Sequence, residues 1–215
     1  MYIFSILGSP RKGSNTDLLI DEVLKGAADA GAEVEKIYIS DLKFAPCTGC
    51  MKCRADQVCR LAPDDVNMVI KKLDRADGIV LGAPVYSGHV PGPFKSLFDR
   101  LIGQVVKFTY TGGTVNITSA LTPKDRNGVV IGVCAAGLPG MTDAVLEFLK
   151  RNIALHKNNG TIREISADGM VSYAQVNIGA EKFEKTFGPQ GQAIYENGQS
   201  LLKLAYEAGK NLVTG

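Results

Sequence analysis

The sequence predicts an α/β protein whose parallel sheet is covered by helices on both faces. Short apolar segments typical of buried strands recur along the chain, and stretches with helical periodicity separate them. Strands that alternate with helices form right-handed β–α–β units, and parallel strands of this kind need cover on both faces. The pattern runs through all 215 residues, so we expect one domain spanning 1–215.

The first half of the chain supplies two strands and two helices. The segment YIFSILG (2–8) is short and apolar and stops at a polar loop. A helix follows from Thr16, with Gly31 placed to end it. The segment AEVEKIYI (32–39) alternates as a strand does. The second helix starts near Asp64 or Asp65 as a plausible N-cap, and its apolar stripe consists of Val66, Val69, Ile70 and Leu73.

The second half supplies three strands and three helices. The segment GIVLGAPV (78–85) is a buried strand, and the helix after it has Pro93 near its first turn. The segment NGVVIGVCAAG (127–137) is another buried strand, followed by a helix over about 142–156. The segment TIREISADG (161–169) is a weaker strand. A closing helix carries the stripe Leu201, Ala205, Ala208 and Leu212.

Two segments fall outside the alternation, at 103–126 and 170–191. Both are long for simple connections between elements of a compact domain. We expect each to be an insertion that serves as a lid, an interface element or a mobile segment.

Composition and charge narrow the class of protein. The 24 basic and 22 acidic residues give a formal charge of +2, which is too balanced to favour nucleic acid or an anionic membrane as a partner. The longest nearly apolar run, 128–138, is about half of the roughly 20 residues that a membrane helix needs. The N-terminus lacks the basic region of a signal peptide. We therefore expect a soluble cytoplasmic protein, in which thiols stay reduced.

Three loops leave the carboxyl ends of expected strands, where open α/β sheets bind their ligands. The first loop, GSPRKGSNT (8–16), lies just before a helix N-terminus, which favours an anion. Its side chains could donate hydrogen bonds to a phosphate; they belong to Ser9, Arg11, Ser14, Asn15 and Thr16. The alternative is a polar turn that only caps the helix.

The second and third loops could hold a flat ring. The second, within 83–100, combines proline, glycine and Tyr86, which gives a stiff loop with an aromatic face. The third, CAAGLPGMTD (134–143), contains two glycines that allow the backbone to approach a ligand closely. The alternatives are that Tyr86 packs in the core and that the third loop is a plain β–α turn with Thr142 as its N-cap.

Four of the five cysteines lie within thirteen positions, in the spacing C-x2-C-x2-C-x5-C: Cys47, Cys50, Cys53 and Cys59. Four thiolates on one short loop can converge on a [4Fe–4S] cluster. Zinc also accepts four cysteines, although its structural sites usually separate them into two pairs. A redox pair of thiols would need only two of them. The fifth, Cys134, lies in an apolar strand and is most simply a small buried hydrophobe.

Taken together, three motifs resemble the iron–sulfur flavoprotein branch of the NADPH-dependent FMN reductase-like family. The motifs are GSPRKGSNTDLL, CTGCMKC with its later cysteine, and ADGIVLGAPVYSGHVPGPFKSLFDR, and the resemblance covers roughly 1–160. It implies a flavodoxin-like, doubly wound five-stranded sheet in the order 2-1-3-4-5, with the cysteine loop at 46–60.

The resemblance also implies cofactors and the residues that bind them. FMN would take its phosphate contacts from the first loop. Its ring would lie along the second and third loops, at Pro84, Val85, Tyr86, Ser87 and Gly88 and at Ala136, Gly137 and Leu138. The [4Fe–4S] cluster would be held by the four clustered cysteines.

The expected function is electron transfer between the cluster, FMN and an external partner. That partner is an electron carrier such as a ferredoxin, or NAD(P)H, with a small-molecule acceptor, and the resemblance implies a homodimer or homotetramer. No catalytic side chain is expected, because the flavin carries the chemistry; His89 and His156 are both expected to be solvated. The alternatives are a cluster-free NAD(P)H-dependent FMN or quinone reductase, and a zinc-binding or thiol redox-sensing module.

Overall fold

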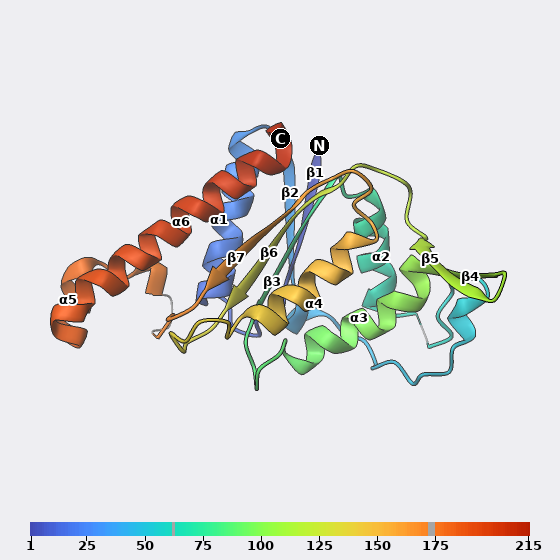
Figure 1. Ribbon diagram of the computed structural model, residues 1–215, viewed down its shortest axis with the longest axis horizontal. Helices are drawn as coiled ribbons and strands as arrows, with labels where there is room; N and C mark the ends of the chain where they lie inside the picture. The colour runs from blue at the N-terminus through green and yellow to red at the C-terminus, as the bar shows by residue number, and fades with distance from the viewer. Residues whose placement is uncertain (62, 172–174) are drawn as a thin grey trace.

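The computed structural model describes residues 1–61, 63–171 and 175–215. Its centre is a five-stranded parallel sheet in the order β2-β1-β3-β6-β7 (Figure 1). The strands are β1 (Tyr2–Leu7), β2 (Glu33–Tyr38), β3 (Gly78–Pro84), β6 (Asn127–Val133) and β7 (Ile162–Ala167). The numbering differs from the expected order 2-1-3-4-5 because the 103–126 segment adds two strands, β4 (Val106–Thr111) and β5 (Thr114–Ser119). These two pair with each other as an antiparallel hairpin that projects beside the sheet.

Helices cover both faces of the sheet, as predicted. On one face lie α1 (Asn15–Asp29) and α6 (Gly191–Thr214), and on the other lie α2 (Asp65–Arg75), α3 (Gly92–Val105) and α4 (Asp143–Ala154) (Figure 1). Side chains of β1 alternate between the two layers: Phe4 and Ile6 pack with α2 to α4, whereas Ile3 and Leu7 pack with α1 and α6. This period of two is what a strand buried on both faces produces.

The helices α1 and α6 touch backbone to backbone. A β-carbon added to Gly26 of α1 would lie 2.1 Å from the carbonyl oxygen of Tyr206, and one added to Gly209 of α6 would lie 1.9 Å from that of Val23. The two glycines therefore set the distance between the helices that cover this face of the sheet.

The closing helix starts earlier than its apolar stripe predicted. The helix α6 begins at Gly191 and extends beyond the sheet, where the short α5 (Ala180–Phe187) packs against it through the buried Phe183 (Figure 1). The segment expected as an insertion at 170–191 therefore contains a helix that extends the α6 layer. Its residues 172–174 lie outside the described residues.

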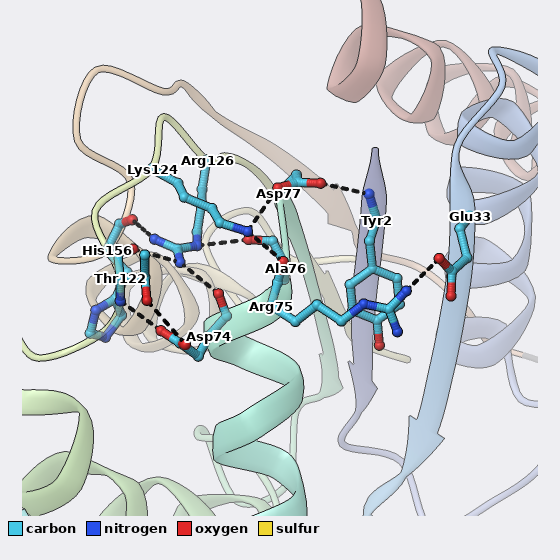
Figure 2. Close-up of polar contacts among 10 residues, drawn as sticks. All are labelled: Tyr2, Glu33, Asp74, Arg75, Ala76, Asp77, Thr122, Lys124, Arg126 and His156. Carbon is cyan, nitrogen blue, oxygen red and sulfur yellow. Dashed lines mark hydrogen bonds and ion pairs between the residues drawn. The ribbon is translucent and has the colours of Figure 1, made fainter.

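At the amino ends of the strands, Arg126 ties the end of the hairpin insertion to the end of α2 (Figure 2). Its guanidinium is almost fully buried and donates to the main-chain oxygens of Ala76 (2.9 Å), His156 (3.1 Å), Asp74 (3.1 Å) and Thr122 (2.9 Å). Four carbonyl dipoles thus stabilise one buried charge.

The side chain of His156 lies next to this cluster and does not face water as expected. It is 6% exposed, and its Nδ1 lies 2.7 Å from the Oγ of Ser119 at the end of β5. Burial, and then the positive charge of Arg126, lower the pKa of His156 to about 4. The imidazole is therefore neutral at pH 7.

Among the described helices, none is long and apolar enough to cross a membrane.

Candidate functional site

A pocket of about 300 Å³ lies at the carboxyl ends of the strands. This volume is at the lower end of the range for small-molecule and cofactor sites. Eight of the residues predicted to bind a cofactor line it: Ser9, Arg11, Ser14, Asn15, Thr16, Pro84, Val85 and Tyr86. Two loops that lie far apart in sequence thus meet at one site, as parallel strands require.

The first loop is folded onto the N-terminus of α1 by its own hydroxyl groups. Ser14 is the N-cap of the helix, and its Oγ accepts a hydrogen bond from the main-chain N–H of Asp17. The same hydroxyl donates to the Oγ of the buried Ser9 at 3.1 Å, and Ser9 in turn accepts from the N–H of Arg11 at 3.2 Å. These bonds hold the hydroxyl groups of the loop and the N-terminus of α1 along one side of the pocket. An arrangement of this kind favours binding of an anion.

A buried ion pair supports the other side of this loop. Asp17, which is 3% exposed, accepts from the main-chain N–H of Gly13 at 2.7 Å and pairs with Lys36 of β2 at 2.5 Å. The pairing anchors the loop to the edge strand of the sheet. Because Asp17 is engaged in these contacts, its charge is compensated near a site that favours anions.

The second loop is a tight turn that presents Tyr86. The N–H of Tyr86 donates to the carbonyl of His89 at 2.8 Å and the reverse bond is 3.0 Å, while Ser87 and Gly88 between them have positive φ angles of 49° and 79°. Such a two-residue turn is stiff. Tyr86 itself is 41% exposed, so it does not pack in the core. His89 packs edge-on against Phe148 at 5.4 Å.

Five predicted residues lie near the pocket but do not line it: Ser87, Gly88, Ala136, Gly137 and Leu138. Four others line it without having been predicted, namely Val133, Ala135, Met170 and Val171. Met170 arrives there because its N–H donates to the carbonyl of Cys134 at 2.9 Å. Gly169, just after the last strand, is the feature of the sequence that could have indicated this contact. Glycine at this position allows the backbone at Gly137 to lie close to it.

The four clustered cysteines lie on an irregular loop between β2 and α2. Cys47 and Cys50 are exposed, Cys53 and Cys59 are half-buried, and all four are free thiols. Within the described residues, no three or more His, Cys, Asp or Glu side chains are placed together as an ion-binding group. The loop therefore brings four soft donors into one region, and the structure does not show them converging on one point.

The cysteines differ in their electrostatic surroundings. A hydrogen bond from the main-chain N–H of Lys52 lowers the pKa of Cys50, which favours the thiolate that binds metal. Burial, together with the charges of the neighbouring cysteines, raises the pKa of Cys53. A cation bound among the cysteines would compensate these like charges.

The loop rests on the last turns of α3. The sulfur of Cys53 lies where the side chain of residue 103 would be if it were not glycine: a β-carbon on Gly103 would be 2.2 Å from it. The N–H of Cys59 donates to the Oε1 of Gln104 at 3.3 Å, and Gln104 is held by the carbonyl of Arg100 at 3.0 Å. Arg54 of the loop also stacks over Phe108 of β4, at 4.9 Å.

Arg100 holds both ends of the loop. Its Nη1 donates to the carbonyl of Ala45 at 2.6 Å and pairs with Asp64 at 2.8 Å. Burial alone lowers the pKa of Arg100, but the hydrogen bond and charge of Asp64, with a contribution from Cys59, raise it above its ordinary value. The buried Nε of this guanidinium has no hydrogen-bond partner in the described structure.

Solved structures of other proteins share this architecture. An NAD(P)H:quinone oxidoreductase from Methanothermobacter marburgensis aligns over 99% of this chain and 98% of its own, with a TM-score of 0.66 and 16% identity. An FMN-dependent NADH-azoreductase from Bacillus anthracis aligns over 99% and 100%, with a TM-score of 0.65 and 15% identity. The fold is that of the flavodoxin-like α/β proteins.

Residues 1–120 match the model of the NADPH-dependent FMN reductase family, and the chain belongs to that family. An iron–sulfur flavoprotein of Methanocaldococcus jannaschii is 44% identical over 100 residues, which are 46% of this chain and 51% of that protein. One of Methanosarcina thermophila is 41% identical over 102 residues, 47% and 53% of the two chains. The chain thus spans about half the length of these curated relatives.

Proposed function

We propose that this protein is an iron–sulfur flavoprotein, in which one unit spanning 1–215 transfers electrons between a [4Fe–4S] cluster, FMN and an external partner. The observation that carries this proposal is the presence of two built features in one chain of the FMN reductase family: a pocket with an anion-binding rim, and a four-cysteine loop seated on α3. The names of the relatives from Methanocaldococcus and Methanosarcina support the same assignment.

The residues of the first loop would hold the FMN phosphate. Ser9, Ser14 and Thr16 supply hydroxyl groups at the N-terminus of α1, Asn15 an amide, and Arg11 a positive charge. The ring would lie against Pro84, Val85 and Tyr86, with Ser87, Gly88 and Ala136, Gly137, Leu138 beside it. When bound, FMN supplies transfer of electrons singly or in pairs, and the protein sets its position and potential.

Cys47, Cys50, Cys53 and Cys59 would hold the cluster, which exchanges one electron at a time when bound. The four cysteines would supply four soft thiolate ligands. Because Gly103 has no side chain, the loop can bring Cys53 close to α3. Zinc would accept the same four ligands, so metal analysis must distinguish the two.

The partners follow from the same assignment. The NADPH-dependent FMN reductase family supports NAD(P)H as a donor. A bound cluster would suit a one-electron carrier such as a ferredoxin, with a small molecule as acceptor. No side chain of this chain is required as an acid or base. We place the protein in the cytoplasm, where its free cysteines stay reduced.

We also propose a homodimer or homotetramer. Large apolar side chains are exposed on the β4–β5 hairpin, at Tyr110, Val115 and Ile117, and beside the pocket at Leu138. Exposed apolar patches of this kind mark interaction surfaces. Light scattering on the purified protein measures the assembly, and a monomer at all concentrations would contradict this part of the proposal.

Anaerobic purification with analysis of flavin, iron and acid-labile sulfide tests the function. We expect about one FMN and about four iron and four sulfide per chain. The matched variants are Cys47→Ala, which should lose iron and keep FMN, and Cys134→Ala, which should keep iron. Flavin without iron would support the cluster-free reductase, zinc without iron would support the metal-binding module, and absence of flavin would refute the flavoprotein.

A further inference from the structure

We propose that Arg100 is a positioning residue for the iron–sulfur site: it fastens both ends of the cysteine loop to α3 and supplies its free Nε–H to the sulfur of Cys59. This inference rests on the proposed function only in its second part, which requires a cluster on the loop. The first part concerns the folded loop itself.

The fastening is seen in the contacts of one guanidinium group. Arg100 is 3% exposed and lies on a rigid helix, whereas its two partners lie on either side of the cysteines. The carbonyl of Ala45 precedes Cys47, and the carboxylate of Asp64 follows Cys59. Arg100 therefore bridges the two ends of the loop, which hydrogen bonds between Lys43 and Asp65 also join. A planar guanidinium can form this bridge because its donors point in fixed, separate directions.

Asp64 is itself fixed, which makes it a firm attachment point. Its Oδ1 accepts from the N–H of Val66 at 3.1 Å as the N-cap of α2, and its Oδ2 pairs with Arg100 at 2.8 Å. The loop is thus tied between the start of α2 and the last turns of α3. Gln104 adds a third attachment by accepting the N–H of Cys59.

The free Nε–H of Arg100 requires an acceptor. A buried donor without a partner is destabilising, and native structures rarely leave one. The N–H of Cys59 donates to the Oε1 of Gln104, and the amide of Gln104 donates to the carbonyl of Arg100, so Cys59 is held beside the same turn of helix. The charge of Cys59 also acts on Arg100. We therefore assign the sulfur of Cys59, as a cluster ligand, to this donor.

The assignment has a consequence for the redox potential. Hydrogen bonds and positive charge near the sulfur ligands stabilise the more negative, reduced form of a cluster and so raise its potential. Arg100 should therefore keep the potential higher than the same four cysteines would have without it. A lysine at this position keeps the charge but cannot reproduce three separate directions of donation.

The test compares Arg100→Lys, Arg100→Met and the double variant Arg100→Met/Asp64→Asn with the wild type, all purified anaerobically. The double variant removes both buried charges and keeps an N-cap for α2, so it remains informative if Arg100→Met alone does not fold. Lys95→Met is the matched control, because Lys95 is a cation of the same helix whose partner is the exposed Asp99. FMN content and circular dichroism establish folding.

Trypsin cleavage within the loop, at Lys52, Arg54 and Arg60, reports the fastening without reference to any metal. We expect cleavage at least five-fold faster in the two variants that replace Arg100 with Met, iron content at least halved in both, and wild-type behaviour in Lys95→Met. For Arg100→Lys we expect a cluster with a more negative potential.

Wild-type cleavage rates in the two variants that replace Arg100 with Met would overturn the fastening, and a wild-type potential in Arg100→Lys would overturn the role of Nε. If the wild type itself carries no iron, the proposed function fails while the cleavage rates still decide whether Arg100 holds the loop.

Discussion

Gly103 of α3 and Cys53 of the cysteine loop are in contact without any side chain between them, because a β-carbon on Gly103 would lie 2.2 Å from the Cys53 sulfur. Real β-carbons do not approach another atom so closely. The surface of the helix therefore has a gap where Cys53 of the loop lies against it. Gly103 lies in the last turn of α3, where glycine is a weaker helix former than alanine.

The first prediction concerns Gly103→Ala. Alanine improves helix propensity by at most about 1 kcal/mol in this last turn, but its β-carbon must displace Cys53. We expect the iron content of anaerobically purified protein to fall at least two-fold while the thermal midpoint stays within a few degrees of wild type.

Gly92→Ala is the control for this change, since the added β-carbon at the start of the same helix would meet no atom within 4 Å. It should keep full iron content. Equal iron in both variants would mean that the contact between Gly103 and Cys53 does not matter for loading.

The second prediction separates the two roles of Ser14. As the N-cap of α1 it stabilises the fold, and Ser14→Ala should cost about 1 kcal/mol in the free energy of unfolding. As a donor to phosphate it should also contribute about 1.5 kcal/mol or more to FMN binding, so the dissociation constant should rise about ten-fold. Urea unfolding and fluorescence titration of apoprotein with FMN measure the two effects.

Ser14→Thr keeps both the cap and the hydroxyl and should resemble wild type in both measurements. A Ser14→Ala variant that loses stability but binds FMN as tightly as wild type would limit Ser14 to its structural role.

The third prediction concerns pH. The folded pKa of His156, about 4, lies below its ordinary value of 6.5, so the unfolded chain binds the extra proton between these values. The stability from this group is complete above about pH 6.5 and is lost as pH falls toward 4, by an amount on the order of 3 kcal/mol. Urea unfolding at pH 7 and pH 4.5 should show a smaller loss in His156→Gln than in wild type. Equal losses would show that His156 is not the source.

The fourth prediction concerns the contact between α1 and α6. Gly209→Ala forces a β-carbon against the carbonyl oxygen of Val23, where backbone cannot easily yield, and we expect a loss of about 2–3 kcal/mol in the free energy of unfolding. Gly198→Ala on the same helix is the control, because its nearest neighbour, in Val176, would be 3.6 Å away. It should be neutral or slightly stabilising. A reversed ranking would contradict the packing described for these helices.

The sequence predicted the features that depend on local pattern. Period-two and helical apolar stripes identified the strands and helices of the sheet, and position after β1 and β3 brought Ser14 and Tyr86 to one pocket. The sequence identified the segment of β4 and β5 only as a break in the alternation of strands and helices. Most residues of these two strands are exposed, so they lack the apolar face by which a strand is recognised.

Features that depend on contacts between distant segments could not be predicted. The sequence predicts His156 as a solvated residue late in a helix, whereas the structure buries it beside Arg126 and Ser119 at the end of β5. Met170 enters the pocket through backbone pairing with Cys134. In the sequence, the apolar stripe of α3 is explained by packing alone, and nothing in the pattern marks Arg100. Its contacts with Ala45 and Asp64, at the two ends of the cysteine loop, are seen only in the structure.

The helix α3 begins just after the Tyr86 turn and carries the cysteine loop near its other end (Figure 1). From Gly92 to Gly103 an α-helix rises about 16 Å at 1.5 Å per residue. The helix thus fixes, within one chain, the distance between the point where the Tyr86 turn enters α3 and the point where Cys53 lies against Gly103. Lengthening or shortening α3 by one residue between Gly92 and Gly103 would change this distance by about 1.5 Å and rotate the contact with Cys53 by about 100° around the helix axis.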